Sequence, residues 1–208
     1  MIAALNILTP IGQQQVQIAS GDRSDEIAMR AWRASGRHSR PDLAEDSLEY
    51  VKLAGKRWRY YLKRDESATS LDDLVSKIEA RPKGEIGFML VARPTWRNGP
   101  RSIGIAWCRR TWCNHIVLDF LAAHPQSNDP ASGYKGIGFS LMLALAKVAH
   151  HIQCPLVWGE STESSSTFYQ KLLGGRPVSD CFSLDEATLQ AQANELARRD
   201  QIATRSQS

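Results

Sequence analysis

The chain of 208 residues lacks any long apolar run, since no stretch approaches the roughly 20 apolar residues that a helix needs to span a bilayer. Its first eight residues are mostly apolar, but they have neither the basic flank nor the small-residue cleavage site of a secretory signal. The chain also lacks internal repeats and long linker-like segments. These absences predict a soluble cytoplasmic protein of one domain, without membrane contact.

Cysteine is scarce, and the number and spacing of the cysteines disfavour both a zinc centre and a disulfide scaffold. The four cysteines form no Cys-x-x-Cys pair and have no closely spaced histidine partners, which disfavours a zinc centre. A disulfide scaffold is disfavoured at this length. We therefore predict no metal, and we interpret Cys108, Cys113, Cys154 and Cys181 as buried or half-buried thiols.

Positive charge is unevenly distributed along the chain. The formal net charge is +4, but a single early segment carries many of the cations. The positive charge of this segment predicts anionic partners, which are either the phosphates of a cofactor or those of a nucleic acid. Its cations are Arg30, Arg33, Arg37, Arg40, Lys52, Lys56, Arg57, Arg59, Lys63 and Arg64.

Apolar spacing predicts two helices, at residues 41–65 and 70–79, before the first strand. Strands are predicted at 86–92, 102–109 and 115–123, and their short polar connections favour antiparallel neighbours. A helix after residue 136 and a strand at 155–158 predict a parallel crossover, followed by a helix at 164–173 and a strand at 181–184. We expect residues 1–84 to be helical and basic, residues 86–184 to form a core, and residues 186–208 to hold a C-terminal helix and a disordered tail.

A glycine-rich loop lies between the third predicted strand and the following helix. Glycines let a backbone approach a phosphate closely, and the amides and dipole of a helix N-terminus favour negative charge. Simple turn chemistry explains the glycines equally well at this stage. No Lys-Ser/Thr pair closes the loop, which disfavours a nucleoside-triphosphate site. The loop reads Gly133-Tyr134-Lys135-Gly136-Ile137-Gly138.

Two segments resemble motifs of the GNAT acetyltransferase superfamily. The run Leu121-Ala122-Ala123-His124-Pro125 and the loop after it resemble the end of a strand and the Arg/Gln-x-x-Gly-x-Gly/Ala loop. The run Phe168-Tyr169-Gln170-Lys171-Leu172-Leu173-Gly174 resembles the Phe-Tyr-x-Lys-Leu-Gly segment. The resemblance covers residues 86–184 and implies one α/β domain over residues 1–185. Its expected sheet is mixed and mostly antiparallel, with a splayed parallel strand pair and flanking helices.

The resemblance also implies a cofactor, acetyl-coenzyme A or another acyl-coenzyme A. Gly133 stands where the family usually has Arg or Gln, so Lys135 is the candidate to supply a cation. Main-chain groups of the splayed strand are expected to hold the pantetheine, and the loop is expected to hold the pyrophosphate. The implied cofactor-binding residues are Leu121, Ala122, Ala123, Gly133, Tyr134, Lys135, Gly136, Ile137, Gly138 and Phe139.

Three residues are candidates for the chemistry of acyl transfer. Tyr169 matches the family's general acid, since a phenol can protonate a departing thiolate; the alternative is a tyrosine that packs its ring on the sheet. Asp119 lies inside an apolar run, where an unpartnered carboxylate is costly, and this suggests a use for it. Glu160 follows the strand at 155–158 and falls near the expected opening. Either carboxylate is a candidate base, and either has the alternative of an ordinary loop or edge carboxylate.

The leading prediction is therefore an N-acetyltransferase that acts on a primary amine of a small molecule, peptide or protein. One alternative is a nucleic-acid-directed protein, since residues 56–61 interleave cations with aromatics, and it includes a GNAT toxin-like enzyme acting on aminoacyl-tRNA. Another is a silent module that binds acyl-coenzyme A. The sequence leaves open the acceptor, RNA contact through the basic segment, and the choice between a monomer and a homodimer.

Overall fold

The computed structural model describes residues 1–34, 41–97, 99–128 and 133–205. Arg37 and Arg40 of the basic segment, and the last three residues of the predicted tail, lie outside this range. No helix within it combines the length and apolarity needed to cross a bilayer. In chain order the elements are β1 (Ala3–Thr9), β2 (Gly12–Ser20), α1 (Arg23–Arg30), α2 (Pro41–Lys63), β3 (Ser67–Ala68), α3 (Leu71–Ala80), β4 (Ile86–Pro94), β5 (Gly104–Arg110), β6 (Ile116–Ala123), the 3-10 helix η1 (Pro125–Asn128), α4 (Ile137–His151), β7 (Leu156–Glu160), α5 (Glu163–Leu172), β8 (Cys181–Asp185) and α6 (Glu186–Arg205).

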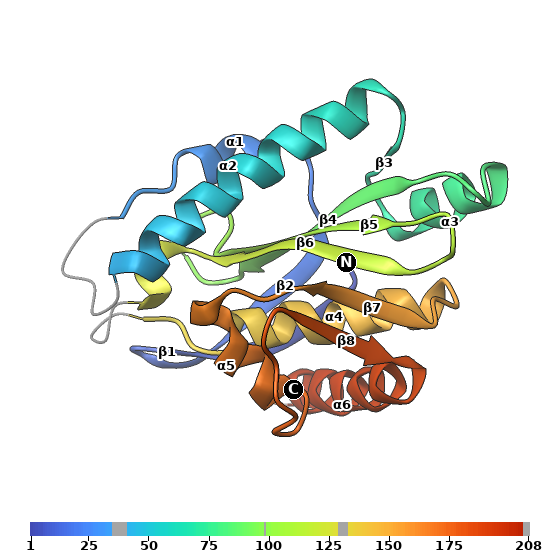
Figure 1. Cartoon of the computed structure of the whole chain (residues 1–208). Coiled ribbons are helices and arrows are strands. Elements are labelled where there is room, and N and C mark those ends of the chain that lie inside the picture. The colour runs from blue at the N-terminus through green and yellow to red at the C-terminus, as the bar shows by residue number, and fades with distance from the viewer. Residues whose placement is uncertain (35–40, 98, 129–132, 206–208) are drawn as a thin grey trace.

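One mixed sheet runs through the molecule, with the strand order β1-β2-β4-β5-β6-β7-β8 and the short β3 beside β4 (Figure 1). Neighbours along this order are antiparallel except β6 and β7, which are parallel, and β3 is parallel to β4. The predicted α/β class, with a mostly antiparallel sheet and a parallel crossover through α4, is confirmed.

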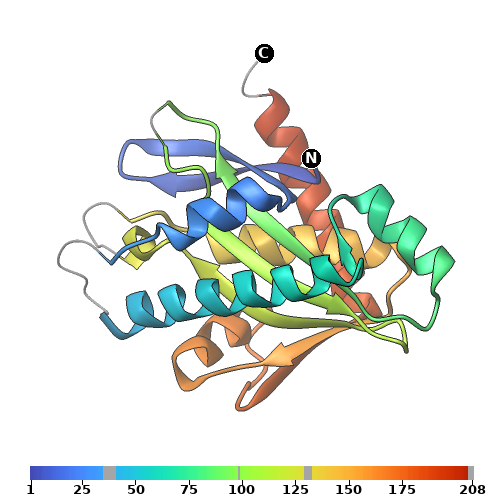
Figure 2. The ribbon, with the colours of Figure 1, turned by 90° about the horizontal axis from the view of Figure 1, so that it is seen from above.

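Helices cover both faces of the sheet. Helices α1 and α2 cross one face, and α4 lies on the other face with α6 packed against it (Figures 1 and 2). The buried side of α2 carries Val51, Ala54, Trp58 and Tyr61 at three- and four-residue spacing, as expected of an amphipathic helix. Helix α4 is buried on most sides because it lies between the sheet and α6.

The prediction that residues 1–84 are helical is wrong at its start. Residues 3–20 form the β1–β2 hairpin, which turns at Gly12 with a φ of 106°. Leu5 and Ile7 of β1 are buried and alternate with less buried residues, which is the two-residue period of a strand. The alternating stretch in β1 is short. In β2, the polar residues 13–15 come before the buried Val16. Neither strand is therefore evident from the sequence.

The cysteines are free thiols, as the sequence suggests, but two of them are more exposed than predicted. Cys108 and Cys154 are buried, whereas Cys113 and Cys181 are exposed. Cys113 lies in the turn after β5, and Cys181 opens the last strand, with its side chain on the exposed face of that strand. The prediction of buried or half-buried thiols is therefore wrong for these two.

Candidate active site

Strands β6 and β7 part after a short stretch of pairing. Their register joins residues 116–118 to residues 157–159, and β6 then continues to Ala123 with only β5 beside it. A bulge explains the parting, because Cys108 pairs with Leu118 and Trp107 with Phe120, which leaves Asp119 as an extra residue. A bulge bends its strand and increases the local twist. Among the described residues, positions 119–123 of β6 therefore present an edge with no strand partner on the β7 side.

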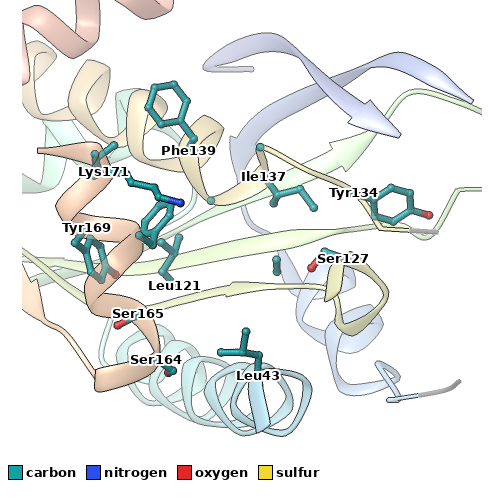
Figure 3. A pocket seen from close by; sticks show the side chains of 15 residues that line it. Leu43, Leu121, Ser127, Tyr134, Ile137, Phe139, Ser164, Ser165, Tyr169 and Lys171 are labelled. Carbon is teal, nitrogen blue, oxygen red and sulfur yellow. The ribbon is translucent and has the colours of Figure 1, made fainter. Parts of the chain in front are cut away.

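A cleft of about 540 Å³ lies at this opening (Figure 3). Its size falls within the range of sites for small molecules and cofactors. The lining combines the end of β6, the start of α4, one face of α5 and the first turn of α2, and it is mostly apolar with a few polar groups. The lining residues are Leu43, Leu121, Ala123, Ser127, Tyr134, Gly136, Ile137, Gly138, Phe139, Ser164, Ser165, Phe168, Tyr169, Lys171 and Leu172.

The N-terminus of α4 opens into the cleft through the glycine-rich loop. Gly136 adopts the left-handed conformation with a φ of 99°, and no side chain caps the helix within the described residues. Lys135 exchanges main-chain hydrogen bonds of 2.9 and 3.2 Å with Leu8 of β1, which fixes the loop to the sheet edge. A Cβ on Gly138 would lie 3.3 Å from the ring of Phe168, so any larger residue there requires that ring to shift by a few tenths of an ångström. The loop therefore directs the amide end of the helix dipole toward the cleft.

Tyr169 forms part of the cleft wall on α5 (Figure 3). Its ring stacks on Phe182 at a centroid distance of 3.8 Å and meets Phe168 edge-on at 5.0 Å. The side chain is 5% exposed, and burial raises the pKa of the phenol, with further contributions from Tyr50 and Cys108. Tyr169 is thus a rigidly held phenol that keeps its proton at neutral pH.

Asp119, at the bulge, belongs to a hydrogen-bonded network on the α2 side of the sheet. Both of its oxygens accept from Arg109, at 2.6 Å from Nε and 2.8 Å from Nη2. Arg109 also donates to Glu85 at 2.9 Å, and Glu85 accepts from the hydroxyl of Tyr61. The hydrogen bond to Asp119 raises the pKa of Arg109. The guanidinium occupies both oxygens of Asp119, so the arrangement suits orientation of the strand better than general-base chemistry.

Glu160 lies at the end of β7, where the strand pair opens. Side chains alternate along a strand, and Val157 faces the core on the α4 side, so Trp158 and Glu160 face the α2 side. The carboxylate of Glu160 is exposed, and within the described residues it has no hydrogen-bond or ion-pair partner. Of the two candidate bases, Glu160 is therefore the one whose oxygens are free to accept a proton.

No protein-family model and no curated protein matches the chain. Among solved structures, the PaiA N-acetyltransferase from Thermoplasma acidophilum in complex with coenzyme A is 13% identical with a TM-score of 0.45, and the match covers 82% of this chain and 98% of that one. The GNAT domain of S. lividans PAT is 13% identical with a TM-score of 0.44, over 88% and 96% of the two chains. A nourseothricin acetyltransferase is 14% identical with a TM-score of 0.37, over 48% and 65%.

The chain thus resembles solved structures of GNAT acetyltransferases, each at a TM-score below 0.5. Similarity at this level of identity concerns the fold alone. An activity therefore has to follow from the residues of the cleft.

The cleft brings together most of the residues singled out from the sequence. Tyr169 and seven of the expected cofactor-binding residues line it: Leu121, Ala123, Tyr134, Gly136, Ile137, Gly138 and Phe139. Ala122 is buried in the cluster under α2, on the other side of the sheet. Gly133 and Lys135 do not line the cleft, and neither do Asp119 and Glu160.

Several lining residues are not among the expected site residues. Ser164, Phe168, Lys171 and Leu172 recur at helical spacing on α5, so this face could have been recognised around Tyr169. Leu43 comes from α2, which is tied to α5 by a 3.4 Å hydrogen bond from Ser164 to Asp46. A contact across that separation has no local signal in the sequence.

The basic segment is a partly neutralised helix surface. Trp58 and Tyr61 are buried against the sheet, so Tyr60 is the exposed aromatic of the interleaved run. This arrangement matches an amphipathic helix with a charged outer face. Several of its cations pair with carboxylates: Arg30 and Arg59 with Glu26, Lys52 with Glu49, and Arg64 with Glu66.

Proposed function

We propose that the protein is an acyl-coenzyme A-dependent N-acyltransferase, with acetyl as the first candidate for the acyl group and a primary amine as the acceptor. The observation that carries the proposal is the course of the cleft. It runs from the glycine-opened N-terminus of α4, along the unpartnered edge of β6, to the buried phenol of Tyr169.

The residues of the cleft fit coenzyme A. The amides of the first turn of α4 suit the pyrophosphate, because the helix dipole favours negative charge at this end. Lys171 lines the same cleft and adds a cation, with its ammonium directed across the opening (Figure 3). The free edge of β6 at Leu121 and Ala123 offers main-chain groups to the amides of pantetheine. Apolar side chains, including Phe168 and Leu172, suit its methylene groups.

Coenzyme A, when bound, supplies an acyl thioester, whose carbon–sulfur bond breaks as a carbon–nitrogen bond to the amine forms. Tyr169 gives its phenolic proton to the departing sulfur and regains a proton from solvent. Glu160 accepts the proton that the attacking amine loses. Asp119, held by Arg109, orients the edge of β6 beside the reaction.

The direct test is release of free coenzyme A from acetyl-coenzyme A during a screen of small amines, peptides and aminoacyl-tRNA. We expect acceptor-dependent release, with the acyl group recovered as an amide by mass spectrometry. Tight binding of coenzyme A without transfer to any acceptor would instead favour a cofactor-binding module, and failure to bind coenzyme A would refute the proposal.

We expect Gly136→Asp to weaken coenzyme A binding on the order of 100-fold, because the new carboxylate would repel the pyrophosphate and would sit at a φ of 99°. Calorimetry with coenzyme A measures the effect. The control is Gly175→Asp, which places the same side chain at a φ of 93° outside the cleft, and it should leave the affinity unchanged. Equal losses in the two variants would point to backbone strain rather than to the site.

We expect Glu160→Gln to slow transfer about 100-fold near neutral pH, since general-base catalysis is typically of this size. The loss should shrink as the pH rises, because the acceptor amine then arrives deprotonated. The measurement is the pH profile of kcat/KM with an identified amine. Glu163→Gln, on α5 three residues further along, is the control. A loss that is constant across the pH range would assign Glu160 to acceptor binding instead.

A further inference from the structure

A second cavity, of about 480 Å³, lies between the C-terminal half of α2 and the sheet. It shares no lining residue with the cofactor cleft, and its volume suits a small molecule. Figure 2 shows α2 crossing the central strands on this side of the sheet. The lining residues are Leu53, Lys56, Arg57, Tyr60, Tyr61, Glu85 and Arg109.

One wall of this cavity is a fixed polar network. The hydroxyl of Tyr61 donates to one oxygen of Glu85, and Arg109 donates to the other at 2.9 Å. Arg109 is held from behind by Asp119. Burial, and then the hydrogen bond to Glu85, raise the pKa of Tyr61 to about 12, so this phenol remains a neutral donor. Polar groups held in this way cost little conformational entropy when a ligand binds.

The other side of the cavity carries positive charge without carboxylate partners. Within the described residues, Lys56 and Arg57 have no ion pair, whereas Lys52 and Arg59 on the same helix each have one. With Arg109, the lining holds three cations and one carboxylate. An excess of positive charge in a concave site favours an anionic ligand.

The remaining lining is aromatic and aliphatic. The ring of Tyr60 is 55% exposed and meets Tyr61 edge-on at a centroid distance of 5.5 Å, and Leu53 is half-buried beside them. Aromatic faces and edges of this kind hold planar apolar groups. The complementary ligand has a ring to contact the tyrosines and an anionic group to reach Lys56 and Arg57.

We propose that this cavity is a second ligand site for a small aromatic anion, a carboxylate or a phosphate ester, separate from the cofactor cleft. Because Arg109 is shared between the cavity and Asp119, an anion that contacts Arg109 competes with Asp119 for the guanidinium. Asp119 lies at the bulge where β6 leaves β7. Occupancy of the cavity therefore acts on the strand edge that borders the cleft, whatever the cleft itself binds.

The test is calorimetry on the full chain with four probes: phenyl phosphate, benzoate, inorganic phosphate and benzyl alcohol. We expect phenyl phosphate and benzoate to bind, and each to bind at least 10-fold more tightly than inorganic phosphate or benzyl alcohol, which carry one of the two features each. Arg57→Gln and Lys56→Gln should each weaken phenyl phosphate at least 5-fold. Lys63→Gln is the matched control, since Lys63 is an exposed cation of the same helix outside the cavity, and it should change nothing.

Saturating coenzyme A should leave phenyl phosphate bound, with an affinity that changes only a few fold through the shared strand edge. Displacement by coenzyme A would place the probe in the cofactor cleft and overturn the proposal. So would equal affinity in the wild type and the Arg57→Gln variant, or no binding of either aromatic anion. Because the probes and variants need no acyl transfer, failure here is distinguishable from failure of the proposed activity.

Discussion

Replacing Tyr169 with phenylalanine should lower the turnover of acyl transfer about 100-fold or more, while the affinity for coenzyme A changes less than about 2-fold. The two effects separate because the ring and the hydroxyl have different roles. The ring stacks on Phe182 and packs against Phe168, and phenylalanine keeps both contacts. In the proposed mechanism, the hydroxyl alone carries the proton for the departing sulfur.

Burial of Tyr169 is compatible with this role, although it raises the pKa of the phenol and so weakens it as an acid. Desolvation disfavours the charged form of any acid, so a thiolate leaving in the same apolar surroundings also has a raised pKa. The difference in pKa between the phenol that donates the proton and the thiolate that accepts it is therefore largely preserved. The phenol also stays protonated throughout the neutral range, so the acid is ready in every catalytic cycle.

Single-turnover transfer with an identified amine, alongside the melting temperature, measures the effect of Tyr169→Phe. Tyr134→Phe is the control, because it removes a phenolic hydroxyl from another part of the same cleft (Figure 3) and should leave turnover unchanged. An unaltered rate in Tyr169→Phe would remove the acid role. It would favour protonation of the thiolate by water, with Tyr169 acting as a packing residue.

The parts of the site that follow from local sequence were predictable. A strand, a glycine-rich turn and an apolar helix in succession predict a phosphate-directed helix N-terminus, and α4 begins there at Ile137. The phase of α5 is equally local, because apolar residues at helical spacing mark the face that the helix turns inward. Phe168 and Tyr169 both line the cleft, and the ring of Tyr169 also stacks on Phe182 of β8.

The parts that depend on irregular or distant contacts were not predictable. The bulge leaves no mark on the apolar run around Asp119, yet it gives the strand its bend and turns Phe120 toward Tyr50 of α2 at a centroid distance of 6.0 Å. The partner of Asp119 is Arg109 on the neighbouring strand. This ion pair offsets the cost of burying the carboxylate, and that cost was the reason for expecting a catalytic role from the sequence. Without the sheet register, a buried structural carboxylate and a base look alike.

We expect Asp25→Ala to lower the free energy of unfolding by about 3 kcal/mol, near the lower end for breaking a buried ion pair, and the melting temperature by roughly 6 to 12 °C. Asp25 is fully buried in α1, with Arg93 and Arg101 as ion-pair partners, the latter at 3.2 Å. It also completes a capping box. The Asp25 carboxylate accepts a hydrogen bond from the Asp22 amide at 2.9 Å, and the Asp22 carboxylate accepts one from the Asp25 amide. Removal leaves two arginines without their buried carboxylate and uncaps the helix.

The same cluster makes the stability of the folded state depend on pH in the acid range. Partial burial acts to raise the pKa of Asp22, but hydrogen bonds from the amides of Asp25 and Ser24 and the charges of Arg101 and Arg93 outweigh it, so the pKa lies below its usual value. A carboxylate with a lowered pKa stabilises the folded state above the unfolded value of 3.8. This contribution is lost as the pH falls through the folded value. Stability should therefore decline below about pH 4.

Asp25→Asn separates the ion pairs from the cap. Asparagine can still accept from the Asp22 amide, so the variant keeps most of the capping box while losing the charge. If the ion pairs dominate, urea unfolding should give Asp25→Asn most of the loss seen in Asp25→Ala. Asp72→Ala is the control, since Asp72 is an exposed carboxylate in the first turn of α3 and should cost less than about 0.5 kcal/mol. A loss in Asp25→Asn no larger than in this control would mean that the cap alone holds α1 on the sheet.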